Sequence, residues 1–248
     1  MRLKGVIAYD GSRFEGFQSQ KHTSNTVVGT LHAALKRMGI ETKVVGSGRT
    51  DRGVHATMQV IHFDLPPFWS DIEKLRNYLQ TYCEPYIQIK RLYGVDSSFH
   101  ARYSAKRRAY RYIITHKKPS PFEAAYLTYN PPLDRELLTK GLSLFVGRHD
   151  FSYFMKSGSD TKSALRTIYR AKLYEYEGKS VIYIEADGFL RAQVRMMVDF
   201  LLKIARGELS LTQLQEQLTL KKRHSTTLAP PNGLYLSKVI YSTKAALI

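Results

Sequence analysis

The segment of residues 46–55 reads Gly-Ser-Gly-Arg-Thr-Asp-Arg-Gly-Val-His and places one carboxylate, Asp51, in a glycine-rich setting. Arg49 and Arg52 lie close on either side of it, and nearby cations favour the ionised form of a carboxylate. Glycine permits the positive φ angles and the close backbone approach that a tight, ligand-facing loop needs. A fixed, ionised carboxylate can act as a nucleophile, a base or a structural anchor. From this segment alone, a turn whose aspartate only pairs with an arginine is the better-supported interpretation.

A second candidate segment, residues 99–118, carries seven Lys or Arg residues and no acid. Its basic residues alternate with Tyr110 and Tyr112 on an expected strand, so cations and aromatic rings should share a surface. Phosphate contacts combined with base stacking are how unpaired RNA is held. The alternative is a solvated edge strand kept soluble by its charge. The complete absence of acids favours nucleic acid.

Other reactive side chains give weaker signals. Arg195 lies beside the apolar stripe of an expected helix, where an arginine either extends to solvent or reaches a buried anion, and Asp51 is the outstanding candidate anion. We expect His55 to be a hydrogen-bonded loop residue and His62 to be a core or cross-strand residue. The single cysteine, Cys83, lies in a helical pattern and is expected to be a half-buried structural thiol.

The composition restricts the classes of function. The chain has 248 residues and 38 Lys or Arg against 21 acids, a formal charge of +17, which predicts attraction to a polyanion. A single cysteine and eight scattered histidines give no metal-ligand spacing, so no metal is expected. We find no signal peptide, membrane span, lysine-rich amphipathic helix or lipidation signal, so we expect no membrane association and a cytoplasmic location.

The elements that would position these residues follow from apolar periodicity. The first half has the order β-α-β-β-α-β, the ferredoxin-like split unit, and the second half repeats it. We therefore expect an α+β protein of two such lobes, residues 1–104 and 105–248, whose mainly antiparallel sheets flank a basic active-site cleft. The expected strands are 3–9, 42–45, 58–63, 87–95, 107–116, 165–176, 181–186 and 234–241, and the expected helices are 28–38, 72–82, 137–145, 190–204 and 211–218.

Together these segments resemble the TruA-type tRNA pseudouridine synthases over nearly the whole chain. Several separated motifs in the right order make a far more specific signal than one glycine-rich loop. The matching segments are residues 9–20 (YDGSRFEGFQSQ), 48–55 (GRTDRGVH), 99–102 (FHAR) with 110–112 (YRY), 147–151 (GRHDF), 189–195 (FLRAQVR) and 233–236 (GLYL).

The resemblance implies isomerisation of uridine to pseudouridine at positions 38, 39 and 40 of tRNA, in the anticodon stem-loop, by a homodimer without a cofactor. It also implies that Asp51 is the nucleophile, that Tyr110 packs on the target base and that Arg195 pairs with Asp51. Attack at the ribose C1′ and attack at the base C6 both remain open. The expected RNA contacts are Arg49, Arg52, Arg102, Lys106, Arg107, Arg108, Arg111 and Arg191.

Two departures and two rival interpretations remain. Arg52 stands where the family commonly has alanine, and residues 83–87 (CEPYI) replace the usual Leu-Pro-x-Asp-Ile, so no role is transferred to that stretch.

A non-catalytic RNA recognition module would share the β-α-β-β-α-β order, but the chain lacks that module's strand signature and a binder has no need of Asp51. A hydrolase with an aspartate nucleophile would want a second acid or a metal, and neither is evident.

Overall fold

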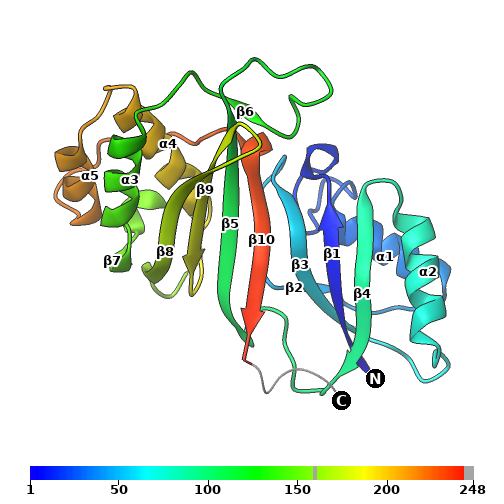
Figure 1. The fold of residues 1–248 in the computed structure, drawn as a ribbon. Helices are drawn as coiled ribbons and strands as arrows, with labels where there is room; N and C mark the ends of the chain where they lie inside the picture. Colours follow the sequence, from blue (N-terminus) through cyan, green and yellow to red (C-terminus); the bar gives the residue numbers. More distant parts are fainter. Residues whose placement is uncertain (159–160, 243–248) are drawn as a thin grey trace. The chain divides into compact units, whose positions relative to one another are not determined.

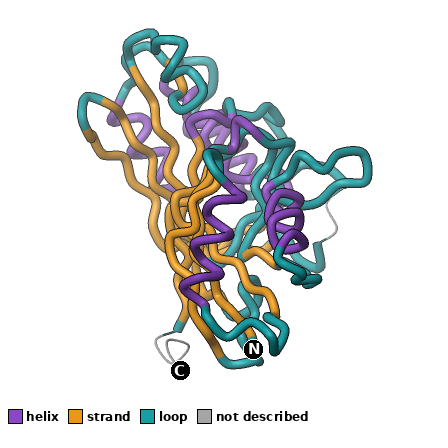
Figure 2. Tube along the Cα trace, turned by 90° about the vertical axis from the view of Figure 1, so that its right-hand side faces the viewer, coloured by secondary structure: helices purple, strands orange, loops and turns teal. Residues whose placement is uncertain are grey.

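The computed structural model describes residues 1–158 and 161–242. The chain forms two compact units. Unit 1 comprises residues 1–106 together with the C-terminal segment from Tyr235, and unit 2 comprises Arg107–Leu234. Both combine strands and helices (Figure 1; Figure 2, strands orange, helices purple), which confirms the expected α+β class.

Unit 1 is a four-stranded antiparallel sheet with the strand order β4-β1-β3-β2, to which the C-terminal strand β10 is added. This is the strand order of the ferredoxin-like unit, and it confirms the β-α-β-β-α-β prediction for the first half. The elements are β1 (Arg2–Tyr9), α1 (Val27–Arg37), β2 (Val45–Gly46), β3 (His55–Asp64), α2 (Ile72–Cys83), β4 (Ile87–Val95) and β10 (Leu234–Tyr241).

The helices of unit 1 begin at polar caps and bury one apolar stripe each. The Thr26 side chain accepts a hydrogen bond from the Gly29 N–H, and Asp71 accepts one from the Lys74 N–H, which satisfies donors left open at each helix start. The α2 stripe ends at Cys83, which is buried. Burial raises the pKa of this thiol to about 12, so the thiolate is scarce at neutral pH, as expected of a structural cysteine.

Unit 2 contains the antiparallel order β5-β9-β8-β7, with β6 parallel to β5. Helix α3 packs on α4, α5 and β8, and a buried aromatic cluster of Phe145, Phe151, Phe154 and Phe200 joins this layer. The elements are β5 (Ala105–Thr115), β6 (Thr128–Tyr129), α3 (Arg135–Leu144), β7 (Gly147–Asp150), β8 (Leu165–Tyr176), β9 (Lys179–Ala186), α4 (Gln193–Ala205) and α5 (Leu211–Leu218).

The last strand has a pairing that chain order does not predict. Residues 234–241 are expected to end the second lobe, and β10 in addition pairs in parallel with β3 through Tyr235 and Leu236. The reason is side-chain contact with unit 1. The Tyr235 ring stacks on His55 with centroids 4.7 Å apart, and the Tyr241 hydroxyl donates to the Ala101 carbonyl at 2.7 Å. The boundary between the two compact units therefore falls near residue 106 and again after Leu234.

Candidate functional site

The Asp51 loop connects β2 to β3 and is tied to the preceding segment of unit 1. The Phe17 N–H donates to the Thr50 carbonyl at 3.1 Å, and the Gly53 N–H donates to the Gly11 carbonyl at 3.2 Å. Within the loop, the Val54 N–H donates to the Asp51 carbonyl at 3.1 Å. Asp51 itself is half-buried. The backbone on both sides of the carboxylate is therefore held by hydrogen bonds.

Hydrogen bonds of two buried side chains, Tyr9 on β1 and Gln59 on β3, support the loop. The Tyr9 hydroxyl lies 2.9 Å from the Thr50 hydroxyl, and burial raises the pKa of Tyr9 to about 12, so it remains a neutral phenol at neutral pH. Gln59 accepts from the Ser47 hydroxyl at 2.7 Å and donates to the Gly48 carbonyl at 2.9 Å. Since a buried polar group without a partner costs about 1–3 kcal/mol, these contacts favour one loop conformation.

The three glycines of the loop, Gly46, Gly48 and Gly53, differ in whether backbone conformation or close packing requires glycine there. Gly53 has φ +76°, a left-handed conformation that costs L-residues energy. A Cβ on Gly46 would lie 2.3 Å from the buried Phe17 ring. A Cβ on Gly48 would meet nothing within 4 Å. The expected need for glycine thus applies to two of the three positions.

A further close approach, at Gly11, gives a stability prediction. A Cβ there would lie 2.0 Å from the Val54 carbonyl oxygen, so Gly11→Ala must displace backbone beside the Asp51 loop. We expect a loss of more than about 2 kcal/mol in the free energy of unfolding, as for other severe steric changes. Gly48→Ala is the control and should be neutral or stabilising by up to about 1 kcal/mol. Denaturant unfolding measures both, and equal losses would contradict this account of the loop.

The histidine and arginine side chains near the loop mostly have hydrogen-bond or ion-pair partners within unit 1. His55 is buried, accepts the Gly11 N–H at 3.0 Å through Nδ1 and lies 3.4 Å from the Asp10 carboxylate, which confirms its expected structural role. Arg52 is exposed and pairs with Glu15 at 3.3 Å. Arg49 is exposed. His62 is buried and accepts the Ala101 N–H at 3.1 Å, as expected of a core histidine.

Tyr110 lies in the middle of β5, in unit 2. Its side chain is 9% exposed, and its ring meets Phe189 edge-to-face with centroids 5.2 Å apart. Tyr112 on the same strand is fully buried, and its hydroxyl bonds Thr128 at 2.8 Å and the Pro230 carbonyl at 3.0 Å. Tyr112 therefore serves the fold of unit 2, whereas Tyr110 keeps a small exposed part.

Arg195 is the third residue of α4 and is half-buried, at the margin of the helix's apolar stripe as expected. Its Nε donates to the Ala229 carbonyl at 2.7 Å, and the Ala229 N–H donates back to the Arg195 carbonyl at 3.1 Å. The guanidinium is thus fixed by a backbone acceptor 34 residues further along the chain.

The basic stretch does not present all its cations on one surface. Successive strand residues point to opposite faces, so Lys106 and Arg108 share a face with Tyr110, while Arg107 and Arg111 lie on the other. Arg107 pairs with Glu185 at 3.0 Å and lies over the Tyr169 ring, and Arg108 donates to the Asp187 carbonyl at 3.0 Å. The surface expected to combine cations and rings is therefore limited to the face of β5 that carries Lys106, Arg108 and Tyr110. Of the other expected RNA contacts, Arg102 and Arg191 are exposed.

Sequence reasoning missed three buried glutamines, Gln59, Gln193 and Gln217, all with 0% exposure. Gln193 accepts the Leu190 N–H at 2.8 Å at the start of α4. Each glutamine occupies an inward position in a strand or helix, and a polar residue in that phase is the signal that could have revealed it.

Comparisons with known proteins agree with these features. The family described as tRNA pseudouridine synthase matches residues 6–104 and 142–242. The chain belongs to this family. Three tRNA pseudouridine synthase A proteins illustrate the likeness. The protein of Helicobacter hepaticus is 45% identical, and the match covers 96% of this chain and 98% of the relative. The protein of Wolinella succinogenes is 44% identical, with 97% of this chain and 95% of the relative covered. The protein of a Campylobacter jejuni strain is 39% identical, with 97% of this chain and 100% of the relative covered.

As a member of the tRNA pseudouridine synthase family, the protein is an isomerase and not a binding module alone. Within residues 1–158 and 161–242, no helix is long and apolar enough to cross a membrane. In the same part of the chain, no three His, Cys, Asp or Glu residues cluster as a metal ion would require.

Proposed function

We propose that this enzyme converts uridines at positions 38, 39 and 40 of tRNA, on the 3′ side of the anticodon stem-loop, to pseudouridine, with Asp51 as the nucleophile. The observation that carries the proposal is the Asp51 loop, in which backbone hydrogen bonds from Phe17, Gly53 and Val54 hold the chain around the half-buried Asp51. Family membership supplies the reaction, and the motif resemblance supplies the target positions.

The chemistry requires one bond exchange within the substrate. The target nucleotide leaves its stack, because its reacting atoms are inaccessible within it, at a cost of a few kcal/mol. Asp51 attacks either C1′ of the ribose or C6 of the base, and the N1–C1′ bond breaks. The base rotates, C5 bonds to C1′ and the bond between Asp51 and the substrate breaks, which restores the carboxylate. A proton leaves C5 and N1 gains one. Atoms and electrons balance without an external donor.

Two side chains of unit 2 complete the proposed mechanism. We assign to Tyr110 packing against the target base and assistance in proton removal from C5. We assign to Arg195 an ion pair that keeps the Asp51 carboxylate ionised and oriented. Two observations support the second assignment: its match to the family motif at residues 189–195, and the hydrogen bond from its Nε to Ala229, which fixes one edge of the guanidinium. The planar fork of an arginine can then hold two carboxylate oxygens.

The charge of +17 should make tRNA affinity strongly salt-dependent, and two variants test which face of β5 the tRNA contacts. Lys106 shares the face of Tyr110 and Arg111 lies on the other, and both are exposed. We expect Lys106→Gln to make the slope of log K against log[salt] shallower by about 0.7–0.9, the loss of one phosphate contact. Arg111 is also an expected RNA contact, but it lies on the opposite face of β5, so Arg111→Gln should leave the slope unchanged when the tRNA contacts only the face of Lys106. The same slope change in both variants would contradict the assignment.

We further propose that the protein acts as a homodimer in the cytoplasm. The motif resemblance supports the dimer, and a tRNA substrate supports the location. Sedimentation equilibrium tests the dimer against the chain mass of 28.5 kDa, and a mass of one chain at working concentration would rule it out.

The function itself is tested with undermodified tRNA that carries tritium at C5 of uridine, since each isomerisation releases that hydrogen to water. We expect release from a tRNA with uridines at positions 38–40, and loss of release when only those uridines are replaced by cytidine. Release that persists after the replacement would show that the target lies elsewhere in the tRNA.

A further inference from the structure

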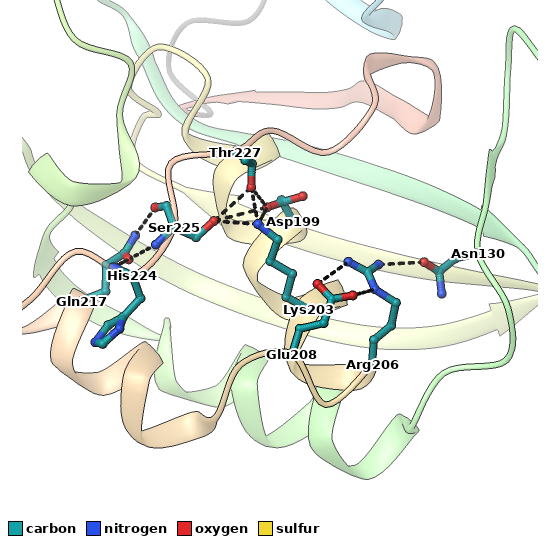
Figure 3. A network of polar contacts seen from close by, with 9 residues as sticks. All are labelled: Asn130, Asp199, Lys203, Arg206, Glu208, Gln217, His224, Ser225 and Thr227. Atoms are coloured by element: carbon teal, nitrogen blue, oxygen red, sulfur yellow. Dashed lines mark hydrogen bonds and ion pairs between the residues drawn. The ribbon is translucent and has the colours of Figure 1, made fainter.

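The segment that follows α5, residues 221–230, is bound along α4 by an organised set of polar contacts, and we call it the strap. Figure 3 shows that side chains of α4 and α5 converge on it. The strap ends at Ala229 and Pro230, of which Ala229 is the residue that holds Arg195. The contacts of the strap therefore bear on the orientation of a proposed active-site side chain.

Gln217 of α5 is the main anchor of the strap. Its Oε1 accepts the N–H groups of His224 at 2.7 Å and Ser225 at 3.0 Å, and its Nε2 donates to the Ser225 carbonyl at 2.9 Å (Figure 3). The same Nε2 donates to the Tyr153 carbonyl at 3.0 Å. These four bonds use both lone pairs and both hydrogens of the amide. A fully buried amide with every group satisfied specifies one conformation, because any other leaves polar groups unpaired.

A second anchor lies on α4. Lys203 pairs with Asp199 at 3.1 Å and donates to the Ser225 hydroxyl at 3.0 Å, and the Thr227 hydroxyl contacts both members of the ion pair. Both charged side chains are mostly buried, with 21% and 15% exposure, so the pair is less screened by solvent than a surface pair.

The distance between the contact points on α4 matches the distance between their partners on the strap. Arg195, Asp199 and Lys203 are four residues apart and so lie on one face of α4. From residue 203 to 195 the helix rises about 12 Å, and the four residue steps from Ser225 to Ala229 can span up to about 13 Å. The strap therefore runs antiparallel to α4 in register, and its anchored part determines where the Ala229 carbonyl lies.

We propose that Gln217, together with the Asp199–Lys203 pair, positions the strap so that the Ala229 carbonyl holds the Arg195 guanidinium in its working orientation. These are positioning residues, since they act through Arg195 and not on the substrate. The inference rests on the proposed role of Arg195 in the isomerisation.

The test uses Gln217→Met, which keeps the length of the side chain and removes all four hydrogen bonds. Gln215→Met is the matched control, because Gln215 is exposed on the same helix. We expect Gln217→Met to lower the single-turnover rate about tenfold to a hundredfold, the range for small misplacement of an active-site group. The KM for tRNA should be essentially unchanged, and amide hydrogen exchange in the strap should accelerate. Gln215→Met should match the wild type in all three.

A double-mutant cycle separates positioning from general destabilisation. In an Arg195→Lys background the Nε that bonds Ala229 is absent, so Gln217→Met should cause little further loss of rate. Equal fold losses in both backgrounds, or a full rate in a folded Gln217→Met variant, would overturn the inference. If Gln217→Met does not fold, Thr227→Val at an exposed strap residue replaces it in the same cycle, with the same two overturning results.

The cycle also distinguishes this inference from the proposed function. A slow Arg195→Lys variant beside a fast, folded Gln217→Met variant would overturn only the positioning role. A fully active Arg195→Lys variant would overturn the proposed role of Arg195 itself, and the inference with it.

Discussion

Asp51→Asn is expected to abolish pseudouridine formation, with a rate reduced on the order of 10⁴-fold or more, as for the loss of a nucleophile. The amide has the size of the carboxylate but cannot attack C1′ or C6 at a useful rate. Binding should survive, since the remaining basic side chains are unchanged. We expect the dissociation constant for tRNA to change by no more than about twofold, the effect of a substitution worth 0.5 kcal/mol.

Asp71→Asn is the matched control for this variant. It makes the same chemical change in the same unit, at the exposed N-cap of α2, where asparagine caps as well as aspartate. We expect wild-type activity. Substantial activity of Asp51→Asn, measured in single turnover with saturating enzyme, would refute its role as the nucleophile.

Replacement of Arg195 should give the second-largest effect. Lysine keeps the positive charge but loses the planar fork and the Nε that donates to Ala229. We expect Arg195→Lys to lower the single-turnover rate about 10²-fold, the cost of a misplaced group. Arg195→Met also removes the charge and should lower it about 10³-fold, as for a lost electrostatic contact in an active site.

Arg206→Lys, at the other end of the same helix, is the control for a general effect of losing an arginine from α4 and should keep the full rate. A wild-type rate for Arg195→Lys would contradict the proposed ion pair with Asp51. The proposal for Asp51 as the nucleophile would survive that result.

Much of the fold follows from the sequence because periodicity reports burial directly. The stripe of residues 72–82 predicts α2 well. Residues 3–9 predict the position of β1, although Leu3 to Ile7 are buried without alternation. The strands β2, β6 and β7 have only two to four residues, and such short strands depend on their pairing partners and leave little pattern. The pairing of β10 with β3 was missed because order along the chain does not determine which sheet edge a terminal strand joins.

The candidate site was predicted in its residue types and less well in its contacts. Asp51 and Arg195 stand out by composition and by their place in a motif or on a helix margin. The pairing of Arg52 with Glu15 and the bond of Arg195 to a backbone carbonyl depend on tertiary approach, and sequence spacing does not encode it. Gln217 was missed because a polar residue within an apolar stripe weakens the periodic signal on which the helix prediction depends.

The most direct test of the proposed function is to map pseudouridine at single-nucleotide resolution in undermodified tRNA after incubation with the wild-type protein and with Asp51→Asn. We expect pseudouridine at positions 38, 39 and 40 wherever uridine occurs there, and none with the variant. Pseudouridine only outside the anticodon stem-loop would contradict the proposed target. The same sites modified by Asp51→Asn would contradict the proposed nucleophile.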